Sequence, residues 1–249
     1  GWDIQTATDG RIQLWSGNQI TSNGVGTNRI GALNTRNGTT FTVGLSNTLL
    51  IDSDSSNLEP VTKNGAGTLV INGDVSAMPQ MNGGAFILNG VHFSSNYGES
   101  KTFANGTLFG GNATVEENNR ATYTFAAGST LAPGSAGIGD TSAGTMVFRY
   151  DRASGYRDFD IILSTGSTLA VDVFADGSSD MIHVTGDSTD SDVNFDIQAG
   201  AALALSGVAP RNRAFTIFQV DGPGDLSGTF DAVTLNGVAL SEGVEYDID

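Results

Sequence analysis

The chain has 249 residues, of which 34 are glycine and none is cysteine, and its hydrophobic fraction of 39% is enough to form a core. Abundant Gly, Asn, Ser and Thr argue against a helical protein, because these residues are costly in helix interiors. The formal net charge of −16 argues against nucleic acid and anionic lipid as partners.

Short segments with alternating apolar and polar residues, each bounded by Gly, Asn or Asp, predict strands with one apolar face. No convincing amphipathic helix lies between them, which excludes crossover helices and leaves sandwiches, barrels, propellers and solenoids. In chain order the apolar sets are Phe41, Val43 and Leu45; Leu69 and Ile71; Tyr123 and Phe125; Leu169, Val171 and Val173; Ile182 and Val184; and Val193, Phe195 and Ile197.

A loose internal repeat favours a β-solenoid among these architectures. Four segments share a Gly, then Thr or Ser-Thr, then a Leu, at Leu69, Leu108, Leu131 and Leu169. The intervals of 39, 23 and 38 residues between these leucines suit one or two coils of roughly 20 residues each. We expect the Gly at a corner of each coil and the Leu in the interior stack.

The sequence predicts neither a membrane helix nor a signal peptide at its start. No stretch approaches the roughly 18 apolar residues of a membrane helix. The start, Gly1 to Gln5, has no basic residues and no apolar run, so we expect an excised piece of a longer protein. Absence of cysteine leaves two interpretations open: chance in a cytosolic protein, or an advantage for a chain exported unfolded.

Four elements of the sequence resemble the passengers of bacterial autotransporters, in that family's order. Lys63 to Gly73 is similar to the passenger-associated strand repeat, K-x-G-x-G-T-L followed by an apolar pair and Gly. Gly128 to Gly137 resembles a G-x-L-x-P-G-x-S-x-G element, and Asp180 to Gly186 a D-x-I/L-x-V-T/S-G element. Phe215 to Phe230 resembles the last passenger coils. Residues 1–60 resemble the family only in their general character and carry no specific motif.

This resemblance implies a right-handed parallel β-helix, with passenger coils over residues 1–192 and C-terminal, autochaperone-like coils over residues 193–249 of the same solenoid. It implies an extracellular location on the bacterial surface, anchored through an outer-membrane barrel outside this chain, or secretion. The implied function is adhesion, self-association or biofilm formation, with roles in virulence. The implied partners are a host matrix protein, a glycan or an identical passenger on a neighbouring cell.

Two alternatives stay open: a structural stalk that presents an N-terminal head outside this chain, and a carbohydrate-active enzyme on the same fold. We expect the chain not to be an enzyme, and we assign no catalytic, cofactor-binding or metal-binding residue and no cofactor.

The residues weighed for nucleophilic catalysis are His92, His183 and Ser188. His183 alternates with Ile182 and Val184, so its side chain should point outward. The G-x-S-x-G elbow is absent, and Gly186-Asp187-Ser188 only approaches the motif of passenger serine proteases. A triad would also need a base within hydrogen-bond reach.

Two pairs of carboxylates have the spacing that puts both on one strand face, Asp158 with Asp160 and Asp52 with Asp54. β-Helical glycosidases and lyases use such pairs as general acid and base. We favour a solvated strand face or turn, because acidic pairs are common in so acidic a chain.

A run of acidic residues raises the question of calcium, which takes six to eight oxygen ligands. Known calcium-loop patterns are missing, so we favour loop residues that hydrogen-bond their own turns. The run comprises Asp176, Asp180, Asp187, Asp190 and Asp192.

Exposed Trp side chains can stack on sugars, and the chain has two, Trp2 and Trp15. We favour packing of Trp15 against the first coil. Arg149, Arg152 and Arg157 alternate with acidic residues, and we favour a self-neutralising loop over an anionic-glycan site.

Overall fold

The computed structural model describes residues 3–4, 12–15, 17–31, 33–35, 38–52, 61–93, 100–134, 136–150, 158–186, 192–209, 213–222 and 224–241. Every regular element in these ranges is a β-strand. They hold no helix, and therefore none long and apolar enough to cross a membrane. The prediction of an all-β protein is confirmed for the described residues.

The largest sheet, sheet A, runs the length of the molecule, and its described strands are parallel except for the last pair. In order of pairing they are β1 (Asp3–Ile4), β4 (Gly26–Ile30), β7 (Asn47–Ile51), β9 (Thr68–Ile71), β11 (Gly84–Leu88), β14 (Thr107–Gly111), β17 (Thr130–Pro133), β20 (Thr168–Val173), β23 (Ala202–Gly207), β26 (Ala232–Leu235) and β27 (Val238–Ala239).

In the described residues, four smaller parallel sheets accompany sheet A. Sheet B is β2 (Ile12–Leu14) and β5 (Leu33–Thr35), and sheet C is β3 (Gln19–Ser22), β6 (Thr40–Val43), β8 (Thr62–Asn64) and β10 (Gln80–Met81). Sheet D is β12 (Val91–Phe93), β15 (Thr114–Glu117), β18 (Thr145–Tyr150), β21 (Met181–Gly186) and β24 (Phe218–Asp221). Sheet E is β13 (Lys101–Phe103), β16 (Ala121–Phe125), β19 (Phe159–Leu163), β22 (Val193–Ile197) and β25 (Asp225–Gly228).

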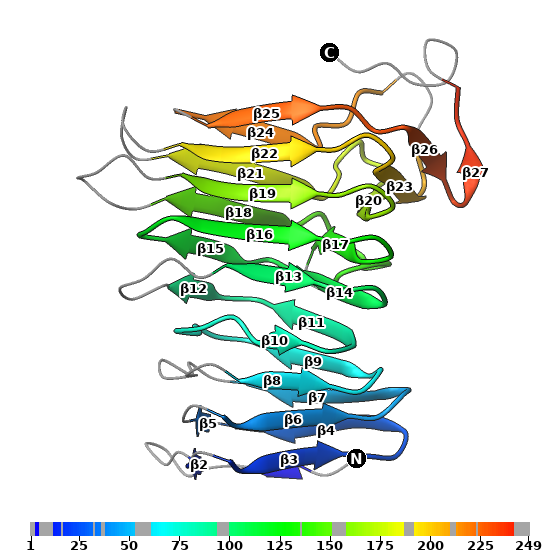
Figure 1. The fold of residues 1–249 in the computed structure, drawn as a ribbon. Helices are drawn as coiled ribbons and strands as arrows, with labels where there is room; N and C mark the ends of the chain where they lie inside the picture. Colours follow the sequence, from blue (N-terminus) through cyan, green and yellow to red (C-terminus); the bar gives the residue numbers. More distant parts are fainter. Residues whose placement is uncertain are drawn as a thin grey trace.

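The chain visits the sheets in rotation. From β13 onward it passes from sheet E to sheet A to sheet D and back to sheet E, one layer further along. Figure 1 shows the result as a stack of layers, with the N-terminus at one end and the last strands, β24 to β27, at the other. Long parallel sheets built in this way are compatible with a β-solenoid.

Matching positions of successive layers form an interior column in sheet A, and each member is at most 6% exposed. It consists of Leu49, Leu69, Phe86, Phe109, Leu131, Leu169, Leu203 and Val233. Leu69, Leu131 and Leu169 were predicted there. Leu108 was not predicted correctly: it pairs with Ala85 and Thr130 on the outer side, and Phe109 takes the interior position. The bulkier aromatic residue fills the core.

The predicted apolar stripes are otherwise buried, with one exception. Leu45 is 75% exposed, although Phe41 and Val43 are fully buried. β6 ends at Val43, and Leu45 lies in the following turn, beside Ser46 with φ +61°. Alternation therefore stops at the corner of the coil.

Aromatic rings stack through the middle of the interior. Phe103 lies against Phe125 with ring centroids 4.5 Å apart, and against Phe109 at 5.3 Å. Towards the C-terminus, Phe195 meets Phe218 edge-on at 5.1 Å. Burial of each such ring contributes about 1.5–3 kcal/mol, and aromatic pairing adds roughly 0.5–1.5 kcal/mol.

The Lys63 to Gly67 segment has a packing explanation. Lys63 is fully buried, and its Nζ donates to the carbonyls of Asn64, Gly65 and Gly83 at 3.2, 2.6 and 2.8 Å. Burial lowers the pKa of Lys63 to about 8. A Cβ at Gly67 would lie 2.1 Å from the carbonyl oxygen of Gly44, so only glycine fits where one coil turns against the next.

Candidate functional site

His183 points outward from β21, as the alternation predicts. Its Nε2 lies 2.8 Å from Oδ2 of Asp221 on β24, and Gln219 Nε2 donates to the same oxygen at 2.9 Å. Within the described residues, the polar contact of His183 is with Asp221, and no hydroxyl completes a triad there. Ser188 lies outside the described residues.

His92 belongs to the interior and not to a surface site. It is fully buried on β12, with Nε2 3.4 Å from Oε1 of Glu117. Glu117 is also fully buried and accepts a 2.9 Å hydrogen bond from the hydroxyl of Tyr123. All three residues of this network, His92, Glu117 and Tyr123, lie in the interior.

The predicted carboxylate pairs are engaged separately. Asp160 accepts a 3.0 Å hydrogen bond from Asn194 Nδ2, while Asp158 lies 4.0 Å from Arg120 Nη2. Asp52 pairs with Arg29, and Asp54 lies outside the described residues. The described carboxylates of these pairs thus hold neighbouring coils together, as expected of a solvated strand face.

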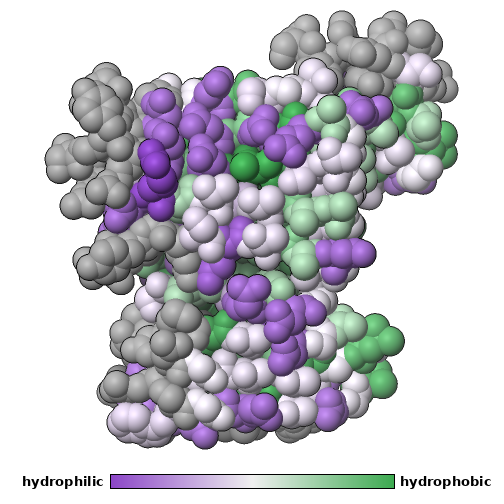
Figure 2. Space-filling model, viewed as in Figure 1, coloured by the Kyte–Doolittle hydropathy of each residue, from purple (hydrophilic) through white to green (hydrophobic). Residues whose placement is uncertain are grey.

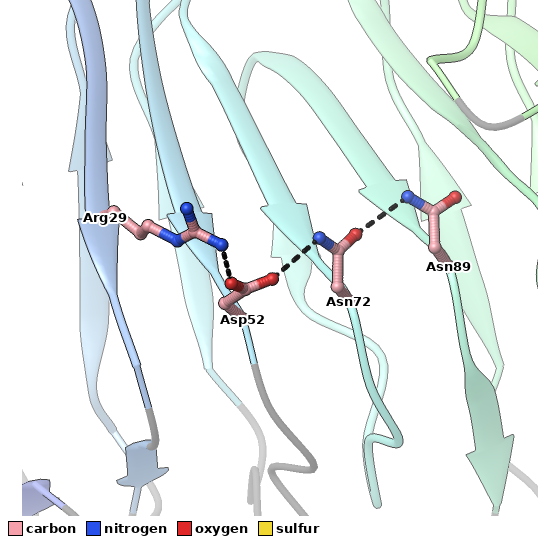
Figure 3. Close-up of polar contacts among 4 residues, drawn as sticks. All are labelled: Arg29, Asp52, Asn72 and Asn89. Atoms are coloured by element: carbon pink, nitrogen blue, oxygen red, sulfur yellow. Dashed lines mark hydrogen bonds and ion pairs between the residues drawn. The ribbon is translucent and has the colours of Figure 1, made fainter. Parts of the chain in front are cut away.

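A polar ladder runs along one edge of sheet A (Figure 3). Asp52 pairs with Arg29 and accepts from Asn72 Nδ2 at 3.1 Å, and Asn72 accepts from Asn89 Nδ2 at 2.9 Å. Asn89 Oδ1 in turn accepts the Asn112 amide at 3.1 Å. The side-chain hydrogen bonds of Arg29 and Asn72 lower the pKa of Asp52. The ladder fixes the register of successive coils.

Sheet C presents a second regular surface, two columns of uncharged polar side chains that we call the sheet C array. The outward residues alternate with buried Phe41, Val43, Lys63 and Met81. One column is Gln19, Thr40, Thr62 and Gln80, and the other is Thr21, Thr42, Asn64 and Asn82. Figure 1 shows sheet E continuing above sheet C on the same side of the stack.

The outer side of sheet E carries acidic residues, in contrast to the uncharged sheet C array. Its outward residues include Asp160, Asp196 and Asp225 on β19, β22 and β25. Figure 2, viewed from the same side, shows pale residues of near-neutral hydropathy over much of the lower layers, with purple hydrophilic residues among them. Neutral and acidic regions thus follow one another along this side of the molecule.

The expectation that Trp15 packs against the first coil was wrong. Trp15 is 58% exposed, because it follows β2 at a turn closed by a 3.2 Å hydrogen bond from the Asn18 amide to its carbonyl. Arg149 pairs with Glu116 across sheet D at 3.0 Å. Residues 151–157 of the expected self-neutralising loop lie outside the described residues, so that expectation stays a prediction. Trp2, Arg152 and Arg157 lie outside the described residues.

The acidic run divides into separate environments. Asp176 is exposed and accepts hydrogen bonds from the amide and hydroxyl of Ser178, which lower its pKa. This agrees with the prediction of a carboxylate that bonds its own turn. Asp192 is exposed before β22, and Asp187 and Asp190 lie outside the described residues.

Asp180 is fully buried and meets Asp172 and Asp140, with one carboxylate oxygen of each within 4.8 Å of the others. Backbone amides already donate to Asp172 and to both oxygens of Asp180. Burial raises the pKa of Asp180 to about 7, and the charges of Asp140 and Asp172 add to this. The arrangement supports proton sharing, and we assign no metal ligand.

The sequence did not predict this cluster, although two of the family-like elements, Gly128 to Gly137 and Asp180 to Gly186, meet in it. A Cβ at Gly134 would lie 2.9 Å from Oδ2 of Asp180, so the glycine of one motif packs on the aspartate of the other. Asp172 lies between the inward-facing Val171 and Val173 and points away from the interior. It is nevertheless only 4% exposed, because the segment that carries Gly139 and Asp140 lies over it.

Comparisons with protein-family models, with curated proteins and with solved structures found no match.

Proposed function

We propose that this chain is a right-handed parallel β-helix from the passenger of a bacterial autotransporter, acting outside the cell in self-association and adhesion. Connections between parallel strands of one sheet are right-handed in almost all proteins, which supports that hand. The fold offers long, regular outer faces and gives each coil most of its contacts with its neighbours. The four sequence elements supply the resemblance to the family.

The sheet C array is the observation that carries the proposal. Two copies of a chain with net charge −16 repel each other overall. The array has no charged residue, so two copies can approach there without opposing like charges. Hydroxyl and amide side chains both donate and accept hydrogen bonds, which makes the array complementary to itself. A two-fold pairing of two arrays is therefore chemically possible.

Individual contacts of this kind are weak. A hydrogen bond contributes about 0.5–1.5 kcal/mol net, since each replaces bonds to water. Many copies on two facing cells would raise the overall avidity far above that of one pair. Weak, repeated contacts suit reversible clumping of cells, and the same donors and acceptors could bind a host glycan or matrix protein.

A stalk is the second candidate, because a stack of similar coils is also a spacer. An assay on bacteria that display the chain through an outer-membrane barrel separates the two. Cells with the chain should settle from suspension faster than cells with the barrel alone, and should bind neutral glycans or matrix proteins more strongly. If cells with the chain and cells with the barrel alone settle and bind equally, the stalk becomes the better-supported function. Hydrolysis or elimination of uronic polymers by the purified chain would instead support a carbohydrate-active enzyme.

A further inference from the structure

A segment between β17 and β18 crosses the outer side of sheet A, and we call its described residues, 136–144, the strap. Ile87 points away from the interior of the coil and yet is only 2% exposed. The strap covers it: a Cβ at Gly137 would lie 2.9 Å from Cδ1 of Ile87 and 3.5 Å from Cδ2 of Leu108. The strap thus shields apolar surface on the outside of sheet A.

Two buried carboxylates hold the strap in place. Oδ2 of Asp172, on β20, accepts the amides of Gly139 at 2.5 Å and Asp140 at 3.0 Å. Oδ1 of Asp180, just before β21, accepts the amide of Gly144 at 2.8 Å. Its Oδ2 accepts the amide of Asp172 at 3.1 Å. Both the middle and the end of the strap therefore depend on these two side chains.

The arrangement brings negative charges together. Asp140, on the strap itself, places an oxygen within 4.8 Å of those of Asp172 and Asp180. Asp172 and Asp180 are 4% and 0% exposed, so water screens their repulsion poorly. If all three were ionised, the strap would be pinned by groups that repel its own Asp140.

The elements around Asp180 place little positive charge near its carboxylate. Gly134, just after β17, lies at contact distance, and on β23 the residue opposite Asp172 is Ser206. The turn after β20 carries Asp176, which bonds Ser178, and Cδ of Arg213 lies 3.8 Å from a Cβ position at Gly177 of that turn. Asn112 Oδ1 faces Gly144. The charged groups that face Asp180 at close range in the described residues are Asp140 and Asp172.

We propose that the strap is a proton-controlled latch, closed while Asp180 shares a proton with Asp140 or Asp172 and loosened when all three carboxylates are ionised. A protonated Asp180 can donate its O–H to a neighbouring carboxylate while its other oxygen keeps the amide of Gly144. Ionisation replaces that hydrogen bond with repulsion. Opening would uncover Ile87 and Leu108 on the outside of sheet A.

Proton exchange has a route to the cluster. A hollow of about 220 Å³ adjoins Asp140 and Asp172, between the strap and the edge of β20 and β23. Its other walls include Val173, Phe174 and Val208. Solvent in this hollow lets the cluster equilibrate with the pH outside while the fold stays intact.

The direction of the pH effect follows from the raised pKa of Asp180. Its ordinary value is 3.8 and its value in the closed strap is about 7. The stabilisation from its proton is fully present below pH 3.8 and is lost as the pH rises through about 7. The strap should therefore open more often at alkaline than at acidic pH.

Amide hydrogen exchange of the full chain, followed by NMR from pH 5 to 8.5 and corrected for intrinsic rates, tests the latch. Protection of the Gly139, Asp140 and Gly144 amides should fall about 10- to 100-fold over this range. Asp180→Asn should abolish that dependence. Asp140→Asn, which leaves both pinning carboxylates in place, should move the midpoint to lower pH and keep the strap closed at pH 8.

Asp176→Asn, an exposed carboxylate nearby, is the matched control and should behave like the unmodified chain. Protection that does not change with pH would overturn the latch. So would a midpoint in Asp140→Asn equal to that of the unmodified chain. A carboxyl carbon titration of Asp180 gives an independent check even if Asp180→Asn fails to fold, and a midpoint below pH 5 would overturn the proposal.

Discussion

Replacement of Leu69 tests which face of each strand lies in the interior. Leu69 is fully buried on β9, opposite Leu49 on β7 and Phe86 on β11. Leu69→Ala should lower the free energy of unfolding by about 2–5 kcal/mol, because it removes buried methyl groups and leaves a cavity. Leu69→Asp should cost several kcal/mol more, since it buries a carboxylate with no partner. Stabilities of about 5–15 kcal/mol are usual, so this variant should not fold stably.

Thr68→Asp is the matched control. Thr68 neighbours Leu69 on the same strand, but it points outward and is partly exposed. Its replacement should change the free energy of unfolding by less than about 1 kcal/mol. Urea denaturation followed by far-ultraviolet circular dichroism measures both variants, and Leu169→Asp should repeat the result on β20. Similar losses for Leu69→Asp and Thr68→Asp would refute the assignment of strand faces.

Three further predictions concern buried charge, the polar ladder and folding. The lowered pKa of Lys63 means that its contribution to stability is present above pH 10.5 and is lost as the pH falls through about 8. The free energy of unfolding should therefore increase as the pH rises from about 8 to 10.5, and Lys63→Met should remove this increase. Asp52→Ala should lower the free energy of unfolding by no more than about 1 kcal/mol at neutral pH, since Arg29 is 45% exposed. The loss should shrink as the pH falls below 3.8 and through the lowered pKa of Asp52, and a loss that does not change at acidic pH would contradict an electrostatic role. Deletion of residues 193–249, which include Phe195, Phe218 and Phe230, should reduce the protease-resistant soluble yield far more than deletion of residues 1–57, and equal losses would count against a C-terminal folding nucleus.

Period-two alternation made the fold class predictable, because burial of one strand face is a local property. Ile182, His183 and Val184 lie as that pattern requires. The repeat was less reliable at Leu108, where an aromatic neighbour competes for the interior position. The interval from Leu131 to Leu169 is a single coil, since the strap and the segment before β19 lengthen it. Coil length is therefore not readable from the leucines alone.

The strap cluster could not be predicted, because its members come from parts of the chain that only the coil brings together. Asp140, Asp172 and Asp180 are 32 and 8 residues apart in sequence, and each looks like a surface carboxylate. The same holds for His183 and Asp221, which are 38 residues apart and pair on adjacent strands. Glu117 was overlooked because a carboxylate in the interior contradicts the expected burial of charged residues.

Settling of displayed cells, compared between matched variants of two faces, tests the proposed self-association most directly. Thr42→Glu with Thr62→Glu places charges in the sheet C array, whereas Thr48→Glu with Thr68→Glu places equal charges on the outer side of sheet A. The proposal predicts that the first pair abolishes the clumping of cells displaying the chain and that the second pair leaves most of it, at equal surface expression. Equal clumping by both variants, or loss only in the sheet A variant, would contradict a role for the sheet C array.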